Sequence, residues 1–475
     1  MLAAAGCAPA VHLPPAEVGL PPAFERPPAP ASAPAGEALA LDRWWEQFGD
    51  AQLTSLIATA LERSTTARLA YARMAEARAT RSQARAATLP SGSLTGTATE
   101  QGSGRLWGTG VDQDPNASFQ GTFYPSWEID LFGRLAATRT RADLDYRSSA
   151  LDFYGTRLAL AGDVAAGLFQ ARYLAVQLDN ARETLRIASE LAATGELGLA
   201  RGLTSGQDAA RLRADRASGE AEVVRLEGEL RAAKRSLLIL IGEPTAATDT
   251  LAIEPTLSPP PALPAATPGL ILTRRPDVRG AEADLAAAAQ TVKIDRLALF
   301  PRLTLQPGLG LTAAAGGGTG LWSLAAGLPV PILDRARLLA ALRISEARGR
   351  QAVITYERTV QTAFGEAENA LTRVEAGTRR VGQLDQAARQ SRYAFDAARR
   401  GYAAGLTDLT TLLQSERTWQ QNRATLDAGR FALLSDTVTA IRALGGGWDP
   451  QADLGPDAVL PPPVPASTVD PTKAP

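Results

Sequence analysis

Residues that could carry catalytic or metal chemistry are scarce in this sequence of 475 residues, which contains one His, one Cys and two Met. A zinc site made of Cys and His needs three or four such ligands, and a nucleophilic dyad could draw only on Cys7 and His12. Gly308-Leu309-Gly310 lies inside a strand candidate without a following helix, so it does not indicate a phosphate-binding loop. We therefore expect no enzymatic activity, no metal site and no dissociable cofactor.

The single cysteine indicates a covalent lipid. Cys7 follows Leu2-Ala3-Ala4-Ala5-Gly6, a run similar to the end of a bacterial lipoprotein signal, although the basic start and most of the apolar stretch are missing. We interpret residues 1–7 as a truncated lipoprotein signal ending at the lipidated Cys7. The alternative is a chance cysteine in a loose terminus. With no second cysteine, a disulfide within the chain is excluded.

Charge and composition point away from nucleic acid and toward long helices. The 49 basic and 50 acidic residues give a net charge of -1, so there is no basic field to attract a nucleic acid partner. Pro-rich composition predicts an extended tether over 8–40, with His12 as a solvated loop residue, and a disordered tail over 448–475. No apolar run reaches the length of roughly 18 residues that a transmembrane helix needs, so membrane insertion would require β-strands.

Two stretches have the pattern of β-hairpins, at about 90–127 and 301–331. In the second, apolar residues recur at every other position on both sides of a Gly-rich turn. Trp107 and Trp322 stand near the loop ends, as aromatic anchors of membrane strands do. The same weak pattern also fits soluble hairpins. The alternating residues are Leu303, Leu305, Leu309 and Leu311, then Trp322, Leu324, Ala326 and Leu328.

Two very long helices are expected at about 133–194 and 334–402. In each, apolar or small residues follow spacings of four and three, which is a heptad seam. The second helix would be roughly 100 Å long at its usual rise per residue. Because the seams are rich in Ala, they favour a layer of closely packed helices over a two-stranded coiled coil. The second seam comprises Val360, Ala363, Ala367, Ala370, Val374, Gly377, Val381, Leu384, Ala388, Ser391, Phe395, Ala398 and Tyr402.

The chain repeats one order of elements, namely helix, hairpin, long helix, turn and helix. Leu89 corresponds to Phe300, Phe132 to Leu333 and Gly202 to Gly405, at separations of 211, 201 and 203 residues. We expect a first repeat over 41–241, a Pro-rich linker over 242–267 and a second repeat over 268–447. Four strands per chain cannot close a barrel, which needs about eight, so a membrane-inserted chain must oligomerise.

Several segments resemble those of the outer-membrane efflux family, the TolC-like channels, and within it the lipoprotein branch that serves RND-type pumps. The resemblance covers about 40 to 448 in the family's order. The segments are Trp44-Trp45-Glu46-Gln47-Phe48, Pro125-Ser126-Trp127-Glu128-Ile129-Asp130-Leu131-Phe132-Gly133-Arg134, Arg274-Arg275-Pro276-Asp277-Val278 with Ala281-Glu282, Leu328-Pro329-Val330-Pro331-Ile332, and Leu444-Gly445-Gly446-Gly447-Trp448.

The resemblance implies a mainly α fold with a small β part. The implied assembly is a homotrimer with a 12-stranded transmembrane β-barrel, four strands per protomer, continuing into a periplasmic α-helical barrel. The implied function is the passive exit duct of a tripartite RND-type efflux pump, lipid-anchored in the bacterial outer membrane. Its partners would be a periplasmic adaptor protein, an inner-membrane RND transporter and outer-membrane lipid.

The resemblance places the periplasmic aperture at the helix turns, about 195–211 and 401–417. Gly195, Gly198, Gly202, Gly401 and Gly405 interrupt the helical pattern there and are expected to supply the turn backbone. The family narrows its tunnel with an aspartate whose position is Gln414 here, close to an arginine that Arg417 matches. Asp408 or Glu416 would then supply the charge instead. Asp208 and Arg211 are the remaining aperture candidates at the first turn.

Two other functions remain open. One is the outer component of a type I protein-secretion system. The lipoprotein-like start and the Gly-Gly-Gly-Trp ending favour the RND branch over this alternative. The other is a coiled-coil rod, which would not need duplicated hairpins.

Overall fold

A computed structural model of the chain describes residues 13–25, 41–101, 116–263, 267–314 and 316–449. Cys7, His12, Trp107 and the segment from 450 onward lie outside these residues. The chain is mainly α with a small β part, as the sequence predicts. The described elements are η1 (Leu41–Phe48), α1 (Ala51–Arg63), α2 (Thr65–Ala86), β1 (Ser91–Gln101), β2 (Asn116–Ile129), α3 (Arg134–Ala200), α4 (Gly206–Leu240), η2 (Thr248–Thr250), α5 (Pro268–Arg274), α6 (Pro276–Leu297), β3 (Leu303–Ala314), β4 (Gly317–Gly327), α7 (Arg335–Ala403) and α8 (Leu409–Ala443).

The chain divides into two compact units, each of which draws on both sequence repeats. The first unit contains Met74–Ala150 and Gly280–Arg358, with the N-terminal residues up to Glu17. The second contains Val18–Arg73, Leu151–Arg279 and the chain from Thr359 onward. The two compact units therefore do not coincide with the sequence repeats 41–241 and 268–447. Each repeat begins and ends in the second unit, and its middle part belongs to the first unit.

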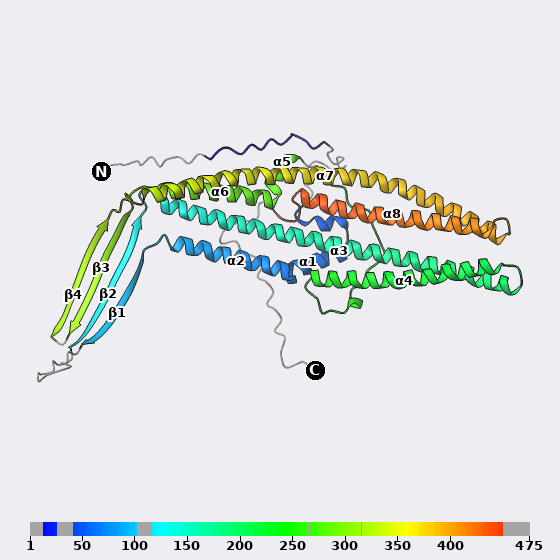
Figure 1. The fold of residues 1–475 in the computed structure, drawn as a ribbon, viewed down its shortest axis with the longest axis horizontal. Helices are drawn as coiled ribbons and strands as arrows, with labels where there is room; N and C mark the ends of the chain where they lie inside the picture. The colour runs from blue at the N-terminus through cyan, green and yellow to red at the C-terminus, as the bar shows by residue number, and fades with distance from the viewer. Residues whose placement is uncertain (1–12, 26–40, 102–115, 264–266, 315, 450–475) are drawn as a thin grey trace. The chain divides into compact units, whose positions relative to one another are not determined.

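The first unit carries one antiparallel sheet in the order β1-β2-β3-β4 (Figure 1). The hairpins expected at about 90–127 and 301–331 correspond to the pairs β1–β2 and β3–β4. Strand β2 also pairs with β3, which joins the two hairpins into a single sheet. Within the described chain, β1 and β4 are each paired on one side only.

The joint between β2 and α3 is built by the segment Glu128–Arg134. Arg134 donates two hydrogen bonds to the Glu128 carboxylate, from Nε at 3.0 Å and from Nη2 at 2.7 Å. The Asp130 carboxylate accepts from the backbone N–H groups of Leu135 and Ala136, which are unpaired at the start of a helix. These contacts explain why the segment resembling the family's motif is so dense in charged residues.

The second unit contains two helix hairpins, in which α4 runs back along the part of α3 after Ala150, and α8 runs back along the part of α7 after Arg358 (Figure 1). The heptad seams of the long helices face their neighbours. Val360, Ala363 and Ala367 are completely buried, and the other seam positions of α7 are buried or half-buried. Along α3, Leu151, Ala165 and Leu168 are buried in the same way. Neither long helix contains a proline, which allows 67 and 69 continuous helical residues.

The segment 13–25 forms neither helix nor strand and contacts α7. In the first unit, the backbone N–H of Glu17 donates to Glu357 Oε1 at 2.8 Å. In the second, Phe24 is buried and its ring stacks on Phe364 at 5.8 Å. The tether thus contributes one anchored aromatic side chain.

No helix among the described residues is both long enough and apolar enough to cross a membrane.

Candidate functional site

The two helix turns of the second unit have the same backbone structure, 203 residues apart. Gly202 and Gly405 both have a φ of 72°, the left-handed conformation that glycine adopts at the end of a helix. The N–H of Leu203 donates to the Gly198 carbonyl and the N–H of Leu406 to the Gly401 carbonyl, both at 2.8 Å. This pattern is the Schellman motif, and it satisfies carbonyls that the helix end would leave unpaired.

The other glycines of these turns do not break the helices, which corrects the expectation from sequence. Gly195 and Gly198 lie within α3, and Gly401 lies within α7. Gly198 is needed for space, because a Cβ placed on it would lie 2.1 Å from Thr204 Oγ1. Gly401 has the same relation to Thr407, at 2.2 Å. Each turn therefore requires one glycine for its φ angle and one for close approach.

The helices that follow the turns begin with equivalent caps. The Ser205 hydroxyl accepts from the backbone N–H of Asp208 at 3.0 Å and donates to the Asp208 carboxylate at 2.7 Å. Asp408 caps α8, accepting from the N–H of Thr411 at 2.8 Å and from its hydroxyl at 2.9 Å. Hydrogen bonds from Thr411 lower the pKa of Asp408, so this carboxylate stays ionised at neutral pH.

The remaining aperture candidates occupy different environments. Gln414 is exposed on α8, and Arg211 is half-buried on α4. Arg417 Nη2 lies 3.5 Å from Asp215 Oδ1, a long ion pair that joins α8 to α4. Glu416, in contrast, is buried within the protomer. The structure thus brings Arg417 and Glu416 together near Asp215, whereas Asp408 and Asp208 are engaged at the helix starts.

The buried position of Glu416 can be recognised in the sequence. It stands four residues after Leu412, three after Leu413 and three before Trp419, so it lies on the apolar face of α8. All three of these neighbours are buried. Burial, and next the charge of Asp215, raise the pKa of Glu416 to about 7, although a hydrogen bond from Gln420 and the charge of Arg417 act in the opposite direction.

Large apolar side chains are exposed at both turns. Leu203 is 80% exposed and Leu406 is 84% exposed, at equivalent positions of the two turns. Leu197, in the last turns of α3, is 60% exposed. Apolar side chains gathered at the ends of two helix hairpins are typical of a surface that contacts another protein.

The sheet of the first unit has one apolar and one polar face. Leu94, Phe123, Leu309 and Trp322 are cross-strand neighbours and form one continuous row over all four strands. Three residues along β1, on the opposite face, the equivalent row is Thr97, Gln120, Thr312 and Thr319. The apolar row is exposed in the protomer, with Leu94 at 78% and Trp322 at 77%. This sheet is suited to separating a lipid phase from water.

Two segments that carry the family resemblance meet beside η1 in the second unit. Arg274 Nη2 forms an ion pair with Asp42 and also donates to the Trp448 carbonyl. The Trp448 indole donates back to the Arg274 carbonyl at 2.7 Å. Trp448, which the sequence assigns to the disordered tail, is in fact buried, since it packs at 5.2 Å on the ring of Tyr154.

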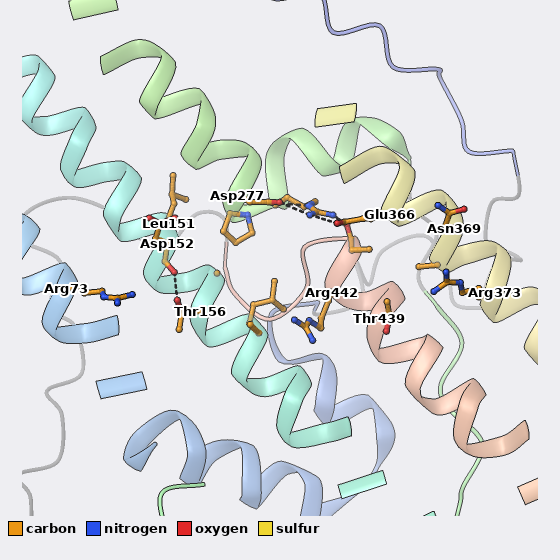
Figure 2. Close-up of a pocket in the computed structure, with 17 residues that line it drawn as sticks. Arg73, Leu151, Asp152, Thr156, Asp277, Glu366, Asn369, Arg373, Thr439 and Arg442 are labelled. Carbon is orange, nitrogen blue, oxygen red and sulfur yellow. Dashed lines mark hydrogen bonds and ion pairs between the residues drawn. The ribbon is translucent and has the colours of Figure 1, made fainter. Parts of the chain in front are cut away.

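A cavity of about 880 Å³ in the second unit is lined by both charged and apolar side chains (Figure 2). Arg275 lines it and bridges Asp277 at 2.7 Å and Glu366 at 2.8 Å. Burial alone would lower the pKa of this guanidinium, but the two carboxylates outweigh it and raise the pKa above its usual range. Asp277, Glu366 and Arg442 lie around the cavity on different segments. Sequence reasoning did not assign a role to any of these contacts.

Among the described residues, no group of three or more His, Cys, Asp and Glu side chains is placed to hold a metal ion.

Comparison with known proteins identifies relatives over nearly the whole folded chain. The family model for outer membrane efflux proteins matches residues 56–243 and 267–446. The pyoverdine export outer membrane protein OpmQ of Pseudomonas putida is 32% identical over 436 residues, covering 89% of this chain and 91% of that protein. The cation efflux system protein CusC of Escherichia coli O6:H1 is 29% identical, covering 85% of this chain and 88% of that protein.

Solved structures agree with the sequence relatives. The outer membrane protein VceC of Vibrio cholerae is similar with a TM-score of 0.74 and 26% identity, over 86% of this chain and 99% of that one.

Proposed function

Because the chain belongs to the outer membrane efflux protein family, it serves as an outer-membrane exit duct of an efflux system, and we propose that three copies form one channel. The observation that carries the proposal is the four-stranded sheet, whose edge strands β1 and β4 are each paired on one side only in the described chain. Three such sheets joined edge to edge give a 12-stranded barrel, which leaves no strand edge in lipid.

The two faces of the sheet give the barrel its orientation. The row Leu94–Phe123–Leu309–Trp322 faces lipid, and the row Thr97–Gln120–Thr312–Thr319 lines the aqueous interior. The periplasmic part is formed by α3–α4 and α7–α8 of each protomer. Their Ala-rich seams allow the close helix spacing that a helical barrel of three protomers requires.

The inner end of the duct is the pair of turns at Gly202 and Gly405. Their exposed Leu203 and Leu406 offer the apolar surface for a periplasmic adaptor protein, through which the channel serves an inner-membrane RND transporter. Of the aperture candidates, Asp408 caps α8, and Gln414, Arg417, Asp208 and Arg211 lie in the first three turns of α8 and α4.

Small molecules or ions are the proposed cargo. Two relatives support this choice, since one is named for pyoverdine export and the other for cation efflux. Protein cargo of a type I secretion system has no such support among these relatives. A coiled-coil rod would leave the amphipathic sheet without a function.

A lipid on Cys7 would add a second membrane anchor. The proposal is supported by the tether, whose described part, residues 13–25, contacts α7 and includes the anchored Phe24. Mass spectrometry of protein extracted from membranes should show an acyl adduct on Cys7 that Cys7→Ser lacks. Cys7→Ser should still assemble, because the barrel inserts independently. An unmodified cysteine in the native protein would contradict lipidation.

Assembly can be tested by mass measurement in detergent combined with a matched pair of variants on β1. The native protein should have three times the protomer mass. Leu94→Arg places a charge on the lipid face, which costs about 2–4 kcal/mol near the membrane centre, so trimer yield should fall. Thr97→Arg places the same charge on the water-filled side and should leave trimer yield nearly unchanged. A stable monomer with native strand content, or equal effects of the two variants, would overturn the barrel.

A further inference from the structure

Glu416 occupies a pocket that no role in the aperture explains. Its side chain is 6% exposed and lies two turns into α8. The pocket, of about 260 Å³, is enclosed by three helices of the second unit. It is lined by Thr184, Ala188 and Leu191 of α3, by Leu212, Asp215, Ser218 and Gly219 of α4, and by Leu413, Glu416, Arg417 and Gln420 of α8.

The charges around this carboxyl only partly compensate for its burial. Helix α4 contributes Asp215, which repels an ionised Glu416, and helix α8 contributes Arg417. Helix α3 presents only uncharged side chains to the pocket. Arg417 is directed toward Asp215 at 3.5 Å and its side chain is 62% exposed, so water screens its charge. Gln420 donates one hydrogen bond to Glu416 Oε1 at 2.8 Å.

The protonation state of Glu416 depends on whether α8 is packed against α4 or has moved away from it. When α8 is packed against α4, burial and Asp215 raise the pKa of Glu416 from 4.5 to about 7. If α8 moved away and the side chain entered water, the pKa would return toward its ordinary value. A raised carboxyl pKa favours the packed arrangement at low pH, and this advantage is lost as the pH rises from 4.5 to about 7.

We propose that Glu416 is a proton-controlled contact, which holds the start of α8 against α3 and α4 when neutral and releases it when ionised. The proposed control of helix packing depends only on contacts within one protomer. Its consequence for transport, a duct whose periplasmic end is held more tightly in acid, rests on the proposed function.

Hydrogen–deuterium exchange of the assembled protein tests the contact without any assay of transport. After correction for the intrinsic exchange rate, opening of the α8 start, Leu409–Gln420, should increase by up to about tenfold per pH unit between roughly pH 4.5 and 7, and become constant above. Glu416→Gln keeps the shape but cannot ionise, so opening should be independent of pH. The matched control is Glu220→Gln, which changes an exposed carboxylate of α4 and should behave like the native protein.

A second pair of variants distinguishes an effect of charge on Glu416 from the loss of the Arg417–Asp215 ion pair. Asp215→Asn and Arg417→Ala both break the same ion pair. Asp215→Asn removes repulsion, so the upper end of the pH window should move down by about one unit. Arg417→Ala removes the favourable cation and should move the same limit upward. If both variants shifted the upper limit of the pH window in the same direction, the ion pair would only hold α8 to α4 mechanically, and the proposal would be wrong.

Conductance in planar bilayers links the contact to transport. The native channel should conduct less at pH 5 than at pH 8, and Glu416→Gln should remove that difference. If exchange depends on pH as described but no channel forms, the contact stands and the proposed function fails. If exchange in the native protein did not depend on pH, the proposed role of Glu416 as a proton-controlled contact would be wrong.

Discussion

Arg274 and Trp448, 174 residues apart, are joined by hydrogen bonds in both directions. The indole Nε1 donates to the Arg274 carbonyl at 2.7 Å, and Arg274 Nη2 donates to the Trp448 carbonyl at 3.3 Å. Gly445 makes this approach possible, because a Cβ there would lie 2.8 Å from the Arg274 carbonyl group. The Gly-rich segment before Trp448 therefore allows the end of the folded chain to dock on the start of its second repeat.

Trp448→Phe should destabilise the second unit by about 0.5–1.5 kcal/mol, because it keeps an aromatic ring but leaves the carbonyl of the half-buried Arg274 without its indole donor. Thermal unfolding in detergent, followed by far-ultraviolet circular dichroism, would measure the loss. Trp322→Phe is the matched control, since Trp322 is 77% exposed on β4, and it should have little effect. Equal losses from both variants would contradict the role assigned to this bond.

Asp50 should contribute stability that depends on pH. Burial raises the pKa of Asp50, but hydrogen bonds from Arg172 and Leu53 and the charge of Arg172 outweigh it, so the net pKa is below 3.8. A lowered carboxyl pKa gives stability that is present above pH 3.8 and lost as the pH falls further. Asp50→Asn should cost about 3 kcal/mol at pH 7, because Arg172 is left buried without its counter-charge.

Urea unfolding at pH 7 and pH 3 measures this difference, which should shrink at pH 3. Asp163→Asn serves as the control, because Asp163 and Arg442 form an exposed pair that should contribute less than about 1 kcal/mol. A difference between native protein and Asp50→Asn that is the same at both pH values would exclude the ionised carboxylate as the cause.

Local sequence patterns predicted the elements because each pattern places the apolar side chains of an element on one face. The heptad spacing of Val360 and Ala363 predicted their burial on α7, and the alternation of Leu309 and Trp322 predicted their shared sheet face. The two turns were predicted at Gly202 and Gly405, whose φ angles are both positive.

Long-range ion pairs could not be predicted in the same way. Asp50 and Arg172 are 122 residues apart, and Asp42 and Arg274 are 232 apart, so no spacing relates the partners. Glu416 was assigned to the aperture because it is charged. Its spacing from Leu412 and Trp419 already indicated a buried face, and the helical period is the better guide there.

Gly198→Ala should open the first turn, because its Cβ would lie 2.1 Å from Thr204 Oγ1 and overpacking costs about 1–3 kcal/mol. Tryptic cleavage after the exposed Arg201 should then become roughly 5- to 150-fold faster. Thr204→Ala in the same chain removes the hydroxyl and should restore slow cleavage. Gly206→Ala, which meets no atom within 4 Å, is the control and should remain resistant. Failure of Thr204→Ala to rescue would show that the close approach is not the cause.

Gln414 should make the proposed aperture less selective for cations than a ring of aspartates would be. The side chain is exposed near the start of α8, and in a trimer three neutral amides would replace three carboxylates. Gln414→Asp should therefore increase cation selectivity and sensitivity to divalent ions in single-channel recordings, because clustered carboxylates concentrate cations where screening is poor.

The control for this ring is Gln421→Asp, which adds the same charge to an exposed position seven residues further along α8. Seven residues return to the same helix face about 10 Å deeper, so a charge there should alter selectivity less if the constriction lies at Gln414. Asp408→Asn tests the competing position at the helix start, where the carboxylate is held by Thr411. If Gln414→Asp leaves selectivity unchanged while Asp408→Asn lowers it, the constriction lies at the cap of α8, and the correspondence of Gln414 with the family's aspartate is wrong.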